Sequence, residues 1–189
     1  AKTLAVNSSK TGHVNYYYNH KRDAADWYKI TLPQDGMLRL RLTSGNGQYI
    51  WAYLFDHNGS TQLTGQNTNG TIDIKYDGLA AGTYYVRINS YYYYLNNNYD
   101  NGGGFEPYTL ADTLFTYSYA ADVEPDDAPY QAKTAPANAS STGHVNFRYN
   151  NSRNNVDWWK INYTGSGDLK LNVTENTWLI DGSNNYYWF

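Results

Sequence analysis

The sequence predicts an all-β protein, with one complete antiparallel β-sandwich followed by the opening part of a second, tandem copy. Three observations lead to this prediction. The chain contains 22 Tyr and 6 Trp but a single Met, and it is rich in Asn, Gly, Ser and Thr, a composition that favours strands joined by tight polar turns. Several segments alternate apolar and polar residues. A stretch near the N-terminus also returns near the C-terminus.

Period-two alternation marks the first two predicted strands. In DWYKI (26–30), Tyr28 and Ile30 share one face, whereas Trp27 and Lys29 share the other. In MLRLRLT, which follows, three leucines alternate with two arginines. Successive side chains of a strand point to opposite faces of its sheet. Each of these strands is therefore expected to have a core face and a solvent face.

Four further strands are predicted downstream, and almost no helix is expected. The segments are YIWAYLFD (49–56), which runs into the turn HNGS, then TIDIKYDG (71–78), GTYYVRINS (82–90) and FEPYTLADTLF (105–115). Short strands at intervals of about 10 residues, separated by Gly, Asn and Asp, are typical of an antiparallel sandwich. The expected core consists of Tyr28, Ile30, Leu38, Leu40, Leu42, Leu54, Val86 and Ile88.

The chain repeats itself with an offset of 131 residues. Residues 1–30 align without a gap with residues 132–161, and 17 of these 30 positions are identical. This period is far too long for a solenoid and indicates duplication of a domain. The sequence therefore predicts a complete sandwich at 1–122, followed by a linker and an incomplete second repeat at 123–189.

The second copy stops at a point equivalent to 49–56 of the first, so counterparts of the later strands are missing from it. Its apolar positions include Trp159, Ile161 and Leu169, which the missing strands would otherwise cover. Unpaired strand edges are a liability. We therefore expect the second copy to be completed or covered by another subunit or by further chain.

Composition excludes several function classes. The net charge is −3, from 14 basic and 17 acidic residues without a block of either sign, so neither a nucleic acid nor an anionic membrane is an expected partner. Cysteine is absent, which excludes disulfides and thiolate metal sites. No apolar run approaches the roughly 20 residues of a membrane span.

The order of EPDDAP (124–129), TGHVN, DWYKI, LPQDGMLRLRL, YLFDHNGS and LAAGTYYVRI resembles the bacterial pre-peptidase C-terminal domain. It is also similar to the collagen-binding domains of clostridial collagenases. The resemblance covers residues 1–117 and the opening half of the second copy from about residue 123. It implies a jelly-roll-like β-sandwich.

The best candidate site is acidic. Glu124, Asp126 and Asp127 precede the second copy, and Asn154 and Asp157 occupy its DxxD-like position. Hard oxygen ligands from two segments suit Ca²⁺, which takes 6 to 8 oxygens. The resemblance implies the same five positions, because the collagen-binding relatives hold calcium with an acidic linker of this type and a DxxD pair. Asn154 keeps an oxygen there but lacks the charge.

The first copy carries the corresponding pair Asp23 and Asp26, without an acidic linker before it in this sequence. That site is expected to have only part of the ligand set. The alternative for both copies is structural: EPDDAP is a solvated linker, and Asp26 and Asp157 cap the turn before a strand.

Tyrosines form the second candidate site. Tyr85 and Arg87 should face away from the core, and Tyr91, Tyr92, Tyr93 and Tyr94 begin a long Asn-rich loop. Aromatic rings beside amides suit glycan or fibrous-protein surfaces and subunit interfaces. The alternative is that most of the tyrosines are ordinary strand formers.

No catalytic centre is expected. The four histidines lack a metal-ligand spacing, and the sequence contains no nucleophile elbow and no phosphate-binding loop. The predicted function is therefore a non-catalytic, extracellular binding or structural module in a tandem array, on a bacterial surface or in a secreted fibre or filament. Its expected partners are other copies or adjoining repeats, and a glycan or fibrous protein. The alternative is an accessory targeting fragment of a secreted peptidase or other hydrolase.

Overall fold

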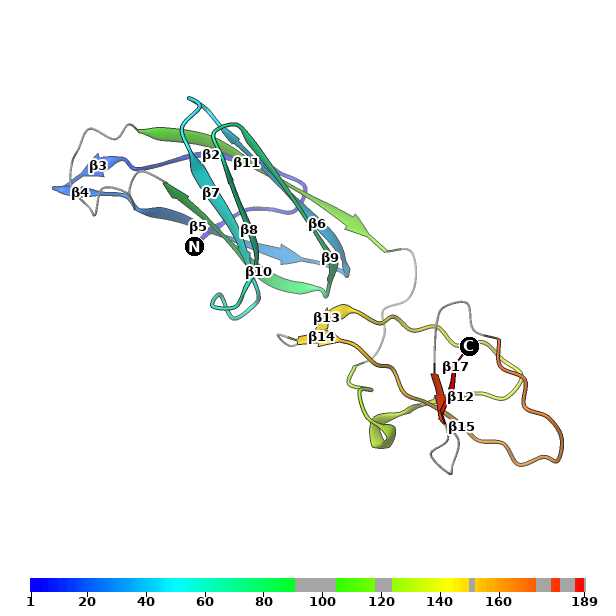
Figure 1. The fold of residues 1–189 in the computed structure, drawn as a ribbon. Helices are drawn as coiled ribbons and strands as arrows, with labels where there is room; N and C mark the ends of the chain where they lie inside the picture. The colour runs from blue at the N-terminus through cyan, green and yellow to red at the C-terminus, as the bar shows by residue number, and fades with distance from the viewer. Residues whose placement is uncertain (91–104, 118–123, 150–151, 173–177, 181–185, 189) are drawn as a thin grey trace.

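The computed structural model describes residues 1–90, 105–117, 124–149, 152–172, 178–180 and 186–188. The first copy forms a β-sandwich, and the second copy forms a smaller body beyond one end of it (Figure 1). One short 3₁₀ helix, η1 (Pro129–Gln131), accompanies the strands. Within the described ranges, no helix combines the length and apolar character that crossing a membrane would require.

Two sheets face each other in the sandwich. The five-stranded sheet has the order β1-β5-β10-β7-β8, and the six-stranded sheet has the order β14-β13-β9-β6-β11-β2. The strands of the first copy are β1 (Lys2–Thr3), β2 (Ser9–Val14), β3 (Tyr17–Tyr18), β4 (Lys21–Arg22), β5 (Ala25–Leu32), β6 (Gly36–Ser44), β7 (Ile50–Phe55), β8 (Gln62–Thr68), β9 (Thr71–Leu79), β10 (Gly82–Ser90) and β11 (Glu106–Thr116).

The predicted all-β sandwich is confirmed, and its inner strand pairs are antiparallel as expected. Parallel pairs occur at the edges, where β1 lies beside β5 and β13 lies beside β9. The sheets are therefore mixed. Sequence alternation could not reveal this, because it fixes which face of a strand is buried but not the direction of its neighbour.

The predicted core is confirmed. All eight residues expected in it are buried, and they belong to one cluster between the sheets. A polar chain also enters this cluster: Tyr28 and Tyr108 place their hydroxyl oxygens 2.8 Å apart, and the Tyr108 hydroxyl donates to Asp26 Oδ2 at 2.5 Å. Buried hydroxyls are stable when paired in this way.

The sequence analysis did not predict β8, nor β1, β2, β3 and β4 near the N-terminus. β8 pairs with β7 alone and lies at the edge of its sheet. Its sequence, QLTGQNT, has almost no apolar residues. An edge strand with a largely solvated surface carries no hydrophobic alternation, so the primary signal for a strand was absent.

The second copy reproduces two strand pairings from the start of the first, although residues 140–145, which are equivalent to β2, form no strand. β12 (Lys133–Ala135) pairs in parallel with β15 (Trp159–Ile161), as β1 does with β5, and the register is the same after the offset of 131. A hairpin of β13 (Phe147–Tyr149) and β14 (Ser152–Asn154) matches β3 and β4. The duplication seen in the sequence is thus also a duplication of local structure.

Backbone detail supports this equivalence. Asn15 and Asn146 occupy equivalent positions, and their φ angles are 61° and 62°. Their carbonyl groups accept hydrogen bonds from Arg22 at 2.7 Å and from Arg153 at 2.6 Å. Positive φ is uncommon outside glycine and is tolerated best by Asn and Asp, which explains why both copies keep Asn at this turn.

The second copy differs after β15. Residues 162–172 contain no strand, although the repeat places 165–174 opposite 35–43, which holds the predicted strand MLRLRLT. Val173 and Thr174 lie outside the described residues. Leu169 is 49% exposed. In the first copy the equivalent strand, β6, pairs with β9 and β11, and neither has a counterpart in the second. Two further short strands, β16 (Trp178–Ile180) and β17 (Tyr186–Trp188), pair with each other.

The hairpin β13–β14 joins the two copies. It extends the six-stranded sheet of the first copy, because β13 lies beside β9 with Arg148 opposite Leu79. The Arg148 guanidinium reaches the buried carboxylate of Asp56, with Nη2 and Nε at 2.7 and 2.8 Å from Oδ2. Ala80 N donates to Arg148 O at 3.3 Å. The joint is therefore made by both backbone and side chains.

Candidate cation site at the junction of the two copies

A short acidic segment leads into the second copy. Residues 124–128 precede η1, and β12 begins shortly after that helix. The carbonyl oxygen of Asp126 accepts a hydrogen bond from Trp158 N at 3.0 Å. This bond ties the acidic segment to the residue just before β15, and so brings two distant parts of the sequence together.

Three carboxylates converge at this point. Oxygens of Glu124, Asp126 and Asp157 lie within 4.8 Å of one another. Asp126 is 0% exposed, and its Oδ2 lies 2.8 Å from Lys133 Nζ. Its Oδ1 has no hydrogen-bond partner among the described residues. A buried carboxylate oxygen without a partner is energetically unfavourable, so a cation held here would stabilise the arrangement.

The Asn154 amide lies between two of these acids. Its Nδ2 donates to Oε1 of Glu124 and, at 2.8 Å, to Oδ1 of Asp157. Its Oδ1 accepts a hydrogen bond from Val156 N at 3.0 Å. Asn154 therefore presents N–H groups to the carboxylates, and its amide oxygen is used by the backbone. It links the acids as a donor in this arrangement.

The acids of this group repel one another even with the ammonium of Lys133 beside Asp126. Burial raises the pKa of Glu124 to about 7, and the adjacent Asp126 acts in the same direction. The hydrogen bond from Asn154 opposes this shift. Like charges at this separation disfavour simultaneous ionisation. A divalent cation would relieve the repulsion and would compete with a proton for Glu124.

The remaining predicted ligands lie apart from this group. Asp127 is exposed and is not one of the three converging acids. In the first copy, Lys2 Nζ lies 2.6 Å from Asp26 Oδ1. Burial raises the pKa of Asp23, and the charge of Asp26 adds to the effect. Asp26 therefore has an ammonium group of the protein as its counter-ion.

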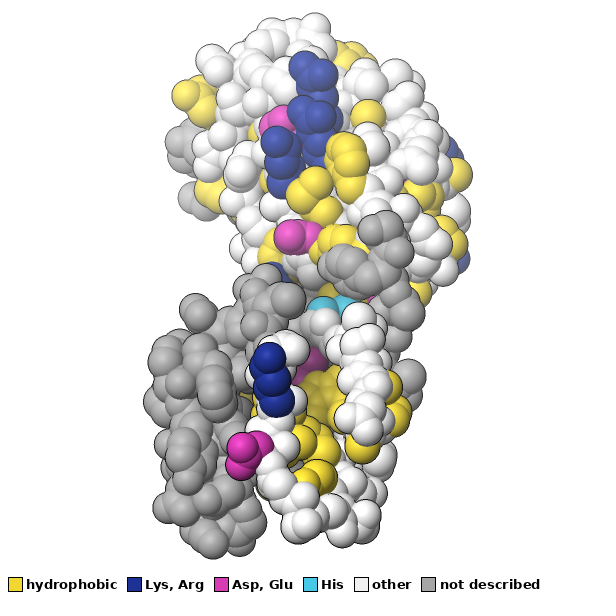
Figure 2. Space-filling model, turned by 90° about the vertical axis from the view of Figure 1, so that its right-hand side faces the viewer, with side chains coloured by type: hydrophobic (Ala, Val, Ile, Leu, Met, Phe, Trp, Pro, Cys, Tyr) yellow, Lys and Arg dark blue, Asp and Glu magenta, His cyan; other side chains and the backbone are white. Residues whose placement is uncertain are grey.

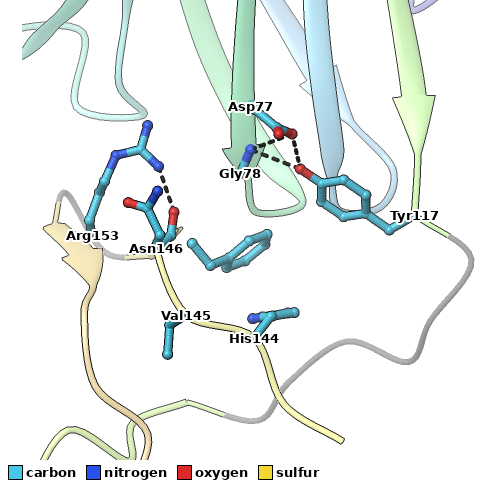
Figure 3. Close-up of a pocket in the computed structure, with 8 residues that line it drawn as sticks. Asp77, Gly78, Tyr117, His144, Val145, Asn146 and Arg153 are labelled. Carbon is cyan, nitrogen blue, oxygen red and sulfur yellow. Dashed lines mark hydrogen bonds between the residues drawn. The ribbon is translucent and has the colours of Figure 1, made fainter. Parts of the chain in front are cut away.

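A pocket lies beside the joint between the copies (Figure 3). The first copy contributes Asp77, Gly78 and Tyr117, and the second contributes residues 144–147 and Arg153. Gly78 has φ of +68°, and a Cβ atom there would lie 2.9 Å from the Asn146 carbonyl oxygen. Glycine is thus required for this close approach. The pocket is a feature of the packing between the two copies.

Tyr85 and Arg87 lie on the outer face of the five-stranded sheet, as expected from alternation along β10. Tyr91, Tyr92, Tyr93 and Tyr94, the rest of the predicted binding surface, lie outside the described residues.

Sequence reasoning missed the aromatic residues that surround Arg87. Trp27 projects from β5, and Trp51, Tyr53 and Phe55 project from β7. The Trp51 and Tyr53 rings are nearly parallel, with centroids 5.7 Å apart. The signal was present in the alternation of YIWAYLFD, whose apolar residues occupy both faces of the strand.

Several solved structures are similar to part of this chain at low sequence identity. The pre-peptidase C-terminal domain of a Bacillus anthracis collagenase is 16% identical, with a TM-score of 0.45 over 59% of this chain and 93% of that one. CorA, a surface-associated copper-binding protein of Methylomicrobium album BG8, is 9% identical, with a TM-score of 0.44 over 60% and 98%. The periplasmic inhibitor of g-type lysozyme PliG from Aeromonas hydrophila is 13% identical, with a TM-score of 0.38 over 60% and 96%.

No curated protein sequence matches the chain. A family model does match part of it, across the segment from the approach to β5 through the end of β10. This segment supplies the strands β5, β7 and β10 at the centre of the five-stranded sheet. The resemblance seen in the sequence is confirmed: residues 24–90 of this chain match the bacterial pre-peptidase C-terminal domain family.

Proposed function

We propose that this chain is a non-catalytic, extracellular β-sandwich module that works in a tandem array, on a bacterial surface or in a secreted fibre. The duplication and the family match support a modular protein. The joint between the copies is the observation that carries the proposal. At this joint, β13 and β14 of the second copy extend the six-stranded sheet of the first, and Arg148 forms a buried ion pair with Asp56. These contacts support a defined geometry between successive copies.

We propose that Ca²⁺ binds beside this joint, through Glu124, Asp126 and Asp157. The set of hard oxygen ligands and the unpartnered, buried Oδ1 of Asp126 fit this ion. Because the ligands come from the linker and from the segment before β15, the ion would fix the second copy to its linker. Extracellular modules bind Ca²⁺ with dissociation constants of about 10⁻⁴–10⁻³ M, which suits a site with three carboxylates and accords with a location outside the cell.

Calorimetric titration of EDTA-treated chain with Ca²⁺ tests the site. We expect saturable binding and a rise in melting temperature, since a ligand present at 100 times its dissociation constant stabilises the folded state by about 2.7 kcal/mol. Asp126→Asn and Asp157→Asn should abolish both effects, whereas Asp127→Asn, which removes an exposed carboxylate outside the group, should leave them intact. No heat and an unchanged melting temperature at about 10–100 mM Ca²⁺, which is 100 times these dissociation constants, would contradict the site.

The binding partners proposed for the array are other copies of the repeat and a glycan or fibrous protein. The second copy exposes apolar side chains, with Val145 58%, Val156 46% and Leu169 49% accessible. Hydrophobic side chains gather in a hollow on this body (Figure 2). A further module packed there would cover them.

The alternative function is an accessory fragment of a secreted peptidase or other hydrolase. The matched family, described as a pre-peptidase domain, favours this candidate specifically. Sequencing the parent gene separates the two: a peptidase domain in the same reading frame supports the accessory role, and further repeats of 131 residues support the array.

A further inference from the structure

The outer face of the five-stranded sheet is both aromatic and positively charged. Trp27, Arg87 and Tyr53 lie opposite one another across β5, β10 and β7. The core residues alternate with them along the same strands, so these three side chains project away from the sandwich interior.

Arg87 lies among three aromatic rings. Its Cζ atom is 4.7 Å from the Tyr53 ring centroid, 5.3 Å from that of Phe55 and 5.6 Å from that of Trp27. Its Nε is buried and has no hydrogen-bond partner among the described residues. Cation–π contacts of this kind hold a guanidinium in place without neutralising its charge.

Two other arginines, Arg39 and Arg148, differ from Arg87 in this respect. Arg39 forms a paired contact with Asp73, and Arg148 forms one with Asp56. Within the described part of the chain, no carboxylate forms an ion pair with Arg87. Its positive charge is therefore fixed in position and open to an external anion.

The rest of the face has the same sign. Lys29 is exposed on β5 and lies diagonally across from Arg87, since it pairs with Tyr85. Diagonal neighbours on one face of an antiparallel pair are about 7–8 Å apart. No acidic residue occupies an outward position on β5, β7 or β10, although the chain as a whole carries a net charge of −3. The charged residues at outward positions of these three strands, Lys29 and Arg87, are thus both basic.

We propose that this face binds an acidic polysaccharide, with the carboxylate or sulfate groups of the polymer paired to Arg87 and Lys29 and its sugar rings packed against the surrounding aromatic side chains. This inference rests on the proposed binding function and names the class of its ligand. Guanidinium groups recognise carboxylate and sulfate oxygens through paired N–H donors. Rigid aromatic side chains add apolar contact area at a low entropic cost.

The face suits a polysaccharide better than an acidic peptide strand. β10 and β7, which carry Arg87 and Tyr53, each pair with a strand on both sides, so they offer no free backbone edge for an added strand. The ligand would therefore contact side chains only, in repeated charged and apolar contacts along the sheet, as a polymer with regularly spaced acidic groups provides.

Binding of the full chain to immobilised polyuronate and to heparin, with neutral dextran and poly-glutamate as comparison polymers, tests the proposal. We expect binding to at least one acidic polysaccharide that weakens as salt rises. Arg87→Gln should weaken it at least tenfold, corresponding to about 1.4 kcal/mol. Arg41→Gln is the matched control, because it removes an exposed cation from the other sheet, and it should change binding less than twofold.

Each outcome decides between alternatives. The polyuronate and heparin arms distinguish carboxylate from sulfate recognition. Equal loss in Arg87→Gln and Arg41→Gln, or equal binding of poly-glutamate with the same dependence on Arg87, overturns the proposal. Binding of dextran that is unaffected by Arg87→Gln overturns the acidic ligand class but leaves the binding function standing. Failure to bind any polymer removes polymer binding from the proposed function. Arg87→Lys keeps the charge and should retain more binding than Arg87→Gln. Both variants should melt close to the unmodified chain, and equal loss of binding in both overturns the role of the charge.

Discussion

Glu106 is a buried acid that neither the ion pairs nor the cation site involve. It is 0% exposed at the start of β11, and Ser90 Oγ donates to its Oε1 at 2.9 Å. Its Oε2 has no hydrogen-bond partner among the described residues. Burial raises the pKa of Glu106 to about 7, against an ordinary value of 4.5. The folded chain therefore binds this proton more tightly than the unfolded chain does.

This shift predicts a pH dependence of stability. Because its pKa is raised in the folded state, the contribution of Glu106 to the free energy of unfolding is fully present below pH 4.5 and is lost as the pH rises towards 7. The loss should be on the order of 3 kcal/mol above pH 7. Glu106→Gln should remove this part of the pH dependence and be more stable than the unmodified chain at pH 8.

Urea unfolding between pH 4 and pH 8 measures the effect. Asp127→Asn is the control, because Asp127 is exposed and its replacement should leave the slope with pH unchanged. If Glu106→Gln keeps the slope of the unmodified chain, Glu106 is not the group responsible.

For single residues, the sequence predicted which side chains are buried but not which hydrogen bonds they form. Alternation was sufficient to assign Leu38, Leu40 and Leu42 to the core, since one slip of register would expose all three. The orientation of the Asn154 amide could not be predicted, because it depends on the backbone N–H of Val156 and on two acids from different segments.

Among the elements, the hairpin β13–β14 determines how the copies meet. Its counterpart in the first copy, β3–β4, has Tyr17 at the position of Arg148. Tyr17 is 46% exposed, whereas the Arg148 side chain is 11% exposed and paired with Asp56. The second hairpin therefore carries a residue specific to docking, and the repeat by itself could not have indicated it.

Removing this ion pair should loosen the joint. Arg148→Met leaves the buried carboxylate of Asp56 with only the backbone and ring of His57 beside it. Removing one partner of a buried ion pair typically lowers the free energy of unfolding by about 3–5 kcal/mol. The double variant Asp56→Asn with Arg148→Met should recover part of this loss, because no buried charge is then left unpaired.

Hydrogen exchange at the Ala80 amide, which donates to Arg148 O, reports on the joint directly. It should become faster in Arg148→Met, while amides of β5 and β10 within the first sandwich stay protected. Equal acceleration in both places would mean that the ion pair stabilises the sandwich and not the contact between the copies.

Element prediction failed where a strand depends on its neighbours. β8 is a polar edge strand with little pattern of its own, and the segment 168–172 has the pattern of β6 but lacks the counterparts of β9 and β11. Strand formation is decided by cross-strand contacts as much as by local preference, so the pattern was insufficient in one case and misleading in the other.

For the whole molecule, duplication was readable from the sequence, but the way the copies meet was not. The offset of 131 residues predicted two related units. The joint depends on contacts such as Arg148 with Asp56, which lie 92 positions apart. Side-chain pattern within one repeat contains no information on such a pair.

We propose that copies of this repeat in different chains pack on one another. Sedimentation velocity of the 189-residue chain at micromolar concentration tests it most directly, because the exposed apolar side chains of the second copy, including Leu169 and Val156, should be covered by another chain. We expect association that increases with concentration. A head-to-tail contact that does not close into a ring would extend into filaments. A monomer at all concentrations, with the amides of the second copy protected from hydrogen exchange, would contradict it.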